Sequence, residues 1–150
     1  MKLLDLVVPT MVAAPGMLVE DVFRECIAKE VPGIPFRDAT GQITGKASIR
    51  HVLKVSCIPD VMVKHAALLG DHLERLMVPA DKAHSMLSLP IDPFVLPDMA
   101  VINSEAPLFK ALAVMEKQDT IYLFVIDGDQ YHGTVSIMGI GRAVLEYGGV

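Results

Sequence analysis

The stretch Gly45-Lys46-Ala47-Ser48-Ile49-Arg50-His51-Val52-Leu53 joins a short strand to a helix through one serine. A glycine opens the apolar strand, the serine follows three residues later, and a helical pattern comes next. The pattern returns at Gly133-Thr134-Val135-Ser136-Ile137-Met138-Gly139, which begins 88 residues further on (133 minus 45). The sequence therefore predicts two similar halves, each organised around a strand-to-helix turn.

The first half reads as a strand, a helix, two strands and a helix. Apolar residues recur at helical spacing between Met17 and Lys29, and the acidic Glu20 and Asp21 fall in the first turn, where the helix dipole favours them. Pro32-Gly33 ends this helix. We expect extended segments at 11–13, 34–36 and 42–48, and a second helix at 49–55.

The second half repeats this order. Pro107 suits the first position of a helix, because its missing N–H would be unpaired there. We expect strands at 121–126 and 131–136 and a final helix at 142–147. Asp38 aligns with Asp127 at a separation of 89 residues (127 minus 38), close to the 88 between the two glycines.

The connection between the halves is harder to align. Val8-Pro9 resembles Val78-Pro79 at a separation of only 70 (78 minus 8), which implies an insertion of about 20 residues within 80–99. Residues 61–77 predict a helix whose apolar positions alternate spacings of four and three, as in a coiled-coil seam. Such a seam suits the protein's own core or a second copy.

Composition excludes several classes of protein. Apolar residues make up 52% of the chain and aromatic residues 5%, a surplus that favours a buried oligomer face. No apolar run approaches the ~20 residues that span a bilayer, and Met1-Lys2-Leu3-Leu4 lacks the shape of a signal peptide, so we expect a cytoplasmic protein without membrane insertion. The net charge is −5 without a basic stripe, which argues against binding a nucleic-acid polymer.

Catalytic and metal motifs are weak. Cys26 and Cys57 lack metal-binding spacing and are expected to be reduced thiols. His65 and His72 would need further ligands to hold a metal. Gly139-Ile140-Gly141 lacks the third glycine of a dinucleotide-binding loop. The sequence offers no nucleophile–base pair, so we expect no enzyme, no metal and no required cofactor.

The ordered repeat resembles a tandem CBS-domain pair, also called a Bateman module. Ile34-Pro35-Phe36-Arg37-Asp38 is similar to that family's apolar-Pro-Val-Val-Asp strand, and Leu123-Phe124-Val125-Ile126-Asp127 occupies the same place in the second half. Residues 45–53 are similar to its Gly-apolar-apolar-Thr/Ser-x-x-Asp-apolar-apolar signature.

The resemblance implies an α+β fold of two βαββα repeats related by a pseudo-twofold axis, with dimerisation into a disc-like assembly. Repeat 1 would cover residues 1–57, a connecting helix and proline-rich insertion 58–98, and repeat 2 residues 99–150. The module would bind AMP, ADP, ATP or S-adenosylmethionine and regulate a partner enzyme, channel or transporter.

A ligand site follows from the same resemblance. We expect it to include Lys46, Ser48, Arg50 and His51 of the first signature, Ile34, Pro35 and Asp38 of the first strand, and Ile102, Phe124 and Ser136 of the second half.

The signature departs from the family at one position in each half. His51 and Gly139 stand where the family has the Asp that holds the ribose. A neutral histidine accepts only one hydrogen bond, and glycine has no side chain. If a single site works, we favour the one with Ser48 and His51.

Two interpretations remain open. The serines suit a phosphate at a helix start, but they equally suit plain helix N-caps. The chain is either a nucleotide-sensing regulator or a dimeric protein-interaction module with degenerate ligand sites.

Overall fold

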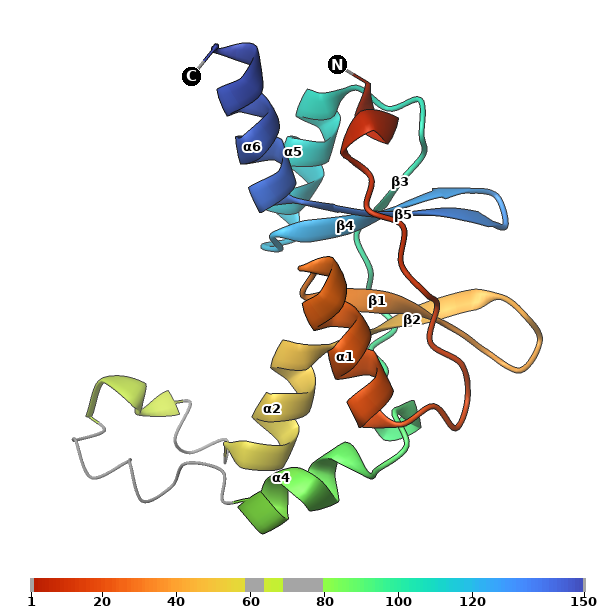
Figure 1. Cartoon of the computed structure of the whole chain (residues 1–150), viewed down its shortest axis with the longest axis vertical. Coiled ribbons are helices and arrows are strands. Elements are labelled where there is room, and N and C mark those ends of the chain that lie inside the picture. Colours follow the sequence, from red (N-terminus) through yellow and green to blue (C-terminus); the bar gives the residue numbers. More distant parts are fainter. Residues whose placement is uncertain (1, 59–63, 69–79, 150) are drawn as a thin grey trace.

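The structure, a computed structural model, describes residues 2–58, 64–68 and 80–149. It consists of two halves whose sheets face each other at the centre of the molecule (Figure 1). The first half contains α1 (Val19–Lys29), β1 (Gly33–Arg37), β2 (Ile43–Ser48) and α2 (Ile49–Cys57). The second contains β3 (Val101–Ile102), α5 (Leu108–Lys117), β4 (Tyr122–Asp127), β5 (Gln130–Ser136) and α6 (Ile137–Tyr147).

Strand register confirms the predicted repeat. β1 and β2 are antiparallel with Phe36 opposite Gly45, and β4 and β5 are antiparallel with Val125 opposite Gly133. Both ladders shift register directly after this pair. A parallel partner lies beside each hairpin, as an isolated bridge at Ala13 in the first half and as β3 in the second. The predicted α+β fold with two repeats is therefore confirmed.

The two halves exchange their leading segments. Val8 pairs with Thr134 of β5 through two hydrogen bonds of 2.9 Å each. Leu96 pairs with Lys46 of β2 in the same way, at 2.8 and 2.9 Å. The two pairings are equivalent in the repeat, because Leu96 lies 88 residues after Val8 (96 minus 8) and Thr134 lies 88 residues after Lys46 (134 minus 46). Figure 1 shows the N-terminal segment running past the second half before it enters the first.

This exchange corrects the predicted insertion. Leu96-Pro97, not Val78-Pro79, is the counterpart of Val8-Pro9, because the backbone pairing places it there. The separation is then close to 88 throughout, and no 20-residue insertion is needed. The region 80–99 is also not structureless, since it contains α4 (Ala80–Leu87) and a 3₁₀ turn, η4 (Asp92–Phe94). An equivalent 3₁₀ turn, η1 (Leu3–Leu6), precedes Val8.

Other boundaries differ from the prediction. α6 begins at Ile137 and not at 142, because Ser136 caps it despite the two glycines in its first turns. Pro107 is the N-cap of α5, whereas the sequence predicted it at the first helical position; the helix itself begins at Leu108. Of the predicted helix at 61–77, the structure describes only 64–68, with a 3₁₀ turn, η2, at Ala66–Leu68. The rest of its apolar seam lies outside the described residues.

Each hydrophobic core is completed by the exchanged segment. The first-half core of Val22, Ile34 and Val52 includes Ile91 and Phe94 from the segment before Leu96. The second-half core includes Leu3 from the chain start, packed with residues such as Leu123 and Ile140. Burying an aliphatic or phenylalanine side chain contributes roughly 1.5–3 kcal/mol. The two halves are thus tied together by their cores as well as by backbone pairing.

No helix within the described part of the chain combines the length and apolar character needed to cross a membrane.

Candidate functional site

A cleft of about 520 Å³ lies where the first signature faces the second half. Its first wall comes from β2 and α2, and its second wall comes from the segment after Leu96 and the connection between α5 and β4. The lining residues are Pro32, Lys46, Ser48, Arg50, His51, Lys54, Leu96, Asp98, Gln118, Asp119, Thr120, Ile121 and Tyr122. We refer to it as the Ser48 cleft.

Ser48 holds the start of α2. It is 7% exposed, and its Oγ accepts a hydrogen bond of 3.2 Å from the backbone N–H of His51. This bond satisfies one of the backbone donors that a helix start leaves unpaired. Ser136 does the same for α6, accepting from the N–H of Gly139 at 3.2 Å. The N-cap interpretation of both serines is therefore confirmed. In the Ser48 cleft, the positive end of the helix dipole lies beside open space.

Tyr122 is a buried residue that lines the Ser48 cleft. Its side chain is buried, and it fills the space left by the missing side chain of Gly33: a Cβ built there would lie 2.6 Å from the Tyr122 hydroxyl oxygen. Burial raises the pKa of Tyr122 to about 12, with the nearby Cys26 and Asp98 adding to the shift and the Ser48 hydroxyl opposing it. Tyr122 therefore contributes a neutral phenol to the lining of the cleft.

The charged side chains of the Ser48 cleft are divided between its walls. Lys46, Arg50 and Lys54 stand on the β2–α2 wall, and Asp98 and Asp119 on the other. The Nζ of Lys46 lies 5.8 Å from the centre of the Tyr122 ring, within the range of a cation–π contact. The cleft thus offers cations beside a helix N-terminus and carboxylates opposite them, which suits a ligand with both anionic and hydroxyl groups.

Four of the ten predicted site residues line this cleft together: Lys46, Ser48, Arg50 and His51. The remaining predicted residues lie elsewhere. Ile34, Pro35, Ile102 and Phe124 are buried in the sheets, and Ser136 caps α6 on the other half.

Asp38 is occupied within its own turn. Its Oδ1 accepts from the backbone N–H groups of Thr40 at 2.9 Å and Gln42 at 3.2 Å, and from the Thr40 hydroxyl at 2.5 Å. Hydrogen bonding, first of all from Thr40, lowers the pKa of Asp38. This aspartate therefore shapes the β1–β2 hairpin and does not line the Ser48 cleft.

Sequence reasoning missed the second wall. Asp98 and the segment 118–122 lie far along the chain from Ser48, and no periodicity connects them. The signal that predicts them is the repeat itself: in a pseudo-twofold pair, each signature faces the segment that precedes the matching strand of the other half. Lys54 was missed for a simpler reason, since it is the residue directly after the end of the signature at Leu53.

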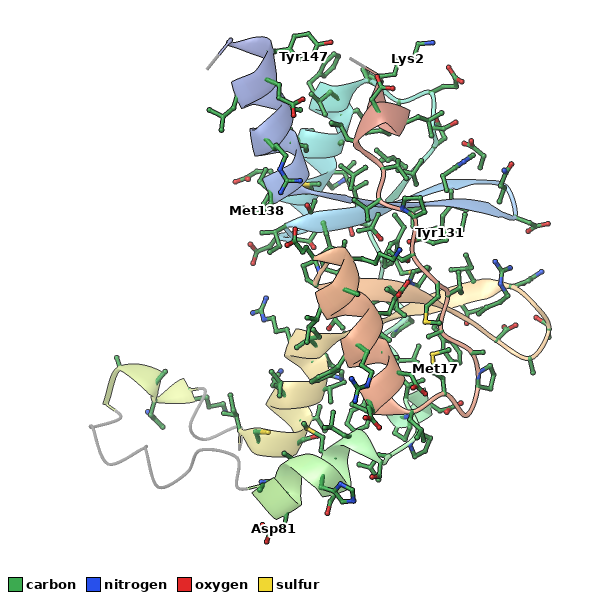
Figure 2. All side chains as sticks on the ribbon, viewed as in Figure 1. Lys2, Met17, Asp81, Tyr131, Met138 and Tyr147 are labelled. Atoms are coloured by element: carbon green, nitrogen blue, oxygen red, sulfur yellow. The ribbon has the colours of Figure 1, made fainter. Side chains whose placement is uncertain are left out.

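The equivalent positions of the second half are built differently. Thr134, Met138 and Gly139 stand at the places of Lys46, Arg50 and His51. The Thr10 hydroxyl lies 2.7 Å from the Tyr131 hydroxyl, which lies 2.9 Å from that of Thr134. Figure 2 shows Tyr131 beside the N-terminal segment. The polar groups here bond to one another.

The comparisons with known proteins agree with this architecture. Residues 91–146 match the model of the CBS domain family. A search of curated proteins found no match.

Solved structures of CBS-domain proteins share the fold of almost the whole chain. A CBS domain-containing protein of unknown function from Kribbella flavida is 14% identical with a TM-score of 0.66, covering 96% of this chain and 99% of its own. A CBS domain-containing protein of unknown function from Bacillus anthracis is 17% identical with a TM-score of 0.63, covering 97% and 94%. The CBSX2 protein, solved in complex with AMP, is 20% identical with a TM-score of 0.63, covering 97% of each chain.

The fold and the paired signatures define a two-repeat module with a cleft between its halves. Residues 91–146 carry the match to the CBS domain family, and the chain as a whole shares the fold of solved CBS-domain proteins. The predicted relation to this family is confirmed.

Proposed function

We propose that this protein is a regulatory module that binds an adenosyl ligand in the Ser48 cleft. The observation that carries the proposal is the cleft itself, in which the capped start of α2 and three cations face the 118–122 segment of the other half. Backbone N–H groups at a helix start favour phosphate. The CBSX2 protein of the same fold was solved with AMP, and another structural neighbour is a putative archaeal homologue of γ-AMPK from Methanocaldococcus jannaschii, which supports an adenine nucleotide as the ligand class.

The proposed role is to sense and not to catalyse. Among the described residues, no group of three or more His, Cys, Asp or Glu side chains is placed to hold a metal ion. The Ser48 hydroxyl accepts a hydrogen bond from the backbone N–H of His51, which suits a binding and capping role. Ligand binding between the halves would change how firmly they hold each other, and this change would pass to a partner enzyme, channel or transporter.

Thermal unfolding with AMP, ADP, ATP and S-adenosylmethionine tests the proposal. A ligand at 100 times its Kd adds ~2.7 kcal/mol of stability to the folded state. We expect such a gain with at least one adenosyl ligand, and a smaller gain in Arg50→Gln, which removes a cation from the cleft without touching the core. The absence of any shift at millimolar concentration with all four ligands would remove the proposal.

A second candidate function is a dimeric interaction module that needs no ligand. Several large apolar side chains of α6 are exposed: Met138 by 72%, Val144 by 58%, Leu145 by 56% and Tyr147 by 70%. Apolar side chains gathered on one helix indicate an interaction surface. We propose that the protein forms a homodimer, which light scattering at micromolar concentration would detect. A dimer that persists without ligand and does not respond to nucleotides would favour this second function.

A further inference from the structure

Three of the chain's 13 lysines and arginines lie in the Ser48 cleft, although the protein as a whole carries a net charge of −5. Arg50 and Lys54 are four residues apart on α2, so they share one face of the helix about one turn apart. Lys46 comes from the strand that leads into the same helix. The cations therefore form a short track that begins at the helix start and continues along α2.

The second half shows that the fold does not require this track. The corresponding residues are Thr134, Met138 and Arg142, of which only the last is a cation. A guanidinium nitrogen of Arg142 lies 4.0 Å from a carboxylate oxygen of Glu30, so its charge already has a neighbour of opposite sign. Two halves with the same backbone thus differ sharply in charge, and the difference points to the ligand of the Ser48 cleft.

The extent of the track matters as much as its charge. At the start of α2 the N–H of Ile49 donates to the Pro32 carbonyl oxygen at 3.1 Å and the N–H of His51 donates to Ser48 Oγ at 3.2 Å, so the Arg50 side chain supplies the main contact for a single phosphate there. Such a phosphate leaves Lys54 one turn away without a contact. A second or third phosphate continues along the helix to Lys54. Asp98 and Asp119 line the opposite wall, where their negative charge disfavours an additional phosphate.

We propose that the Ser48 cleft selects nucleoside di- and triphosphates over the monophosphate and over S-adenosylmethionine, with the distal phosphates on Arg50 and Lys54. This inference rests on the proposed adenosyl-binding function. S-adenosylmethionine carries a sulfonium where a nucleotide carries its first phosphate, so its charge opposes the track.

Isothermal titration of the full chain at fixed ionic strength and without divalent cations tests the selectivity. ATP and ADP bind at least tenfold more tightly than AMP, and S-adenosylmethionine binds more weakly than AMP. Lys54→Gln reduces the preference for ATP over AMP and leaves AMP binding unchanged, and the Arg50→Gln/Lys54→Gln double variant abolishes the preference. Arg142→Gln, which removes the equivalent cation of the other half, is the matched control and keeps the tenfold preference. Circular dichroism checks that each variant is folded.

The outcomes separate this inference from the function on which it rests. Equal affinities for AMP and ATP would contradict the proposed selectivity but not the proposed adenosyl-binding function. A preference for ATP that survives in Lys54→Gln and in the Arg50→Gln/Lys54→Gln double variant overturns the assignment of the track. Binding of none of the four ligands overturns both the inference and the proposed function.

Discussion

Gly45 lies so close to Leu96 that a Cβ built on the glycine would come within 2.5 Å of the Leu96 carbonyl oxygen. The same arrangement recurs in the other half, where a Cβ on Gly133 would come within 2.5 Å of the carbonyl oxygen of Val8. The glycine that opens each signature is therefore required by the crossing of the other half's leading segment. Its role is to let two backbones approach, and this explains why it begins both copies of the repeat.

Gly45→Ala is expected to destabilise the protein by about 1–3 kcal/mol, the usual cost of adding atoms to a closely packed site. The atom in the way is a backbone oxygen, which relaxes less easily than a side chain. Gly141→Ala is the control: it lies in α6 with nothing within 4 Å of its added Cβ, so it should stabilise the helix by up to about 1 kcal/mol. Denaturant unfolding of both variants measures the difference. Equal stabilities would contradict the close approach.

The repeat could be predicted because short sequence patterns within each half indicate its strands, turns and helices. Turn residues, strand patterns and the cap of α2 are encoded within a few residues of Ser48, and these elements and the strands before Ser136 were predicted closely. The exchange of leading segments could not be predicted, since it rests on two short backbone pairings, at Val8 and Leu96, that leave no periodic pattern.

For the same reason, only one of the two walls of the candidate site was predicted. The β2–α2 wall lies within one continuous stretch, and the resemblance pointed to it directly. The opposite wall depends on residues such as Asp98 and Tyr122, which only the folded arrangement brings to Ser48. The start of α6 was missed because Gly139 and Gly141 disfavour a helix locally, while packing of Ile140 and Ala143 in the interior favours it.

His51→Asp is expected to tighten adenine-nucleotide binding if the Ser48 cleft holds a ribose. The substitution restores a carboxylate at the position where the family's signature has Asp, and hydrogen bonds to a charged group contribute roughly 1.5–3 kcal/mol. An acidic residue in the first turn of α2 also stabilises the helix by about 0.3–1 kcal/mol. Titration with ATP and with 2′,3′-dideoxy-ATP separates the two effects, because only the ribose contact distinguishes these ligands. Gly139→Asp, the same change in the other half, is the matched control. Weaker binding of ATP by His51→Asp would show that the ribose lies elsewhere.

Cys26 is expected to resist thiol reagents while the protein is folded. Burial, with a smaller contribution from the charge of Glu25, raises the pKa of Cys26 from 9.0 to about 12. Because the folded-state pKa lies above the unfolded one, the resulting stability is complete below pH 9 and is lost as the pH rises towards 12. At pH 8, an aromatic disulfide reagent should label the partly exposed Cys57 quickly and Cys26 only after unfolding. Cys26→Ala should remove the slow phase and reduce the loss of stability between pH 9 and 12. Rapid labelling of both thiols would contradict the buried placement.

Asp127 is expected to make the second half sensitive to acid. Its carboxylate accepts hydrogen bonds from the hydroxyl and from the backbone N–H of Ser104, the latter at 2.9 Å, and lies 2.8 Å from Nε2 of His132. These contacts, the Ser104 hydroxyl first, lower the pKa of Asp127. A depressed folded-state pKa means that the stability is present above the unfolded value of 3.8 and is lost as the pH falls below it.

Asp127→Asn should therefore lower stability at pH 7 and flatten its decline between pH 4 and pH 2. Asp129→Asn, in the same hairpin turn, removes a charge without removing the link to Ser104 and should leave the acid profile unchanged. Thermal unfolding across this pH range measures both variants. An unchanged profile in Asp127→Asn would show that the link between the hairpin and the β3–α5 connection carries no pH-dependent stability.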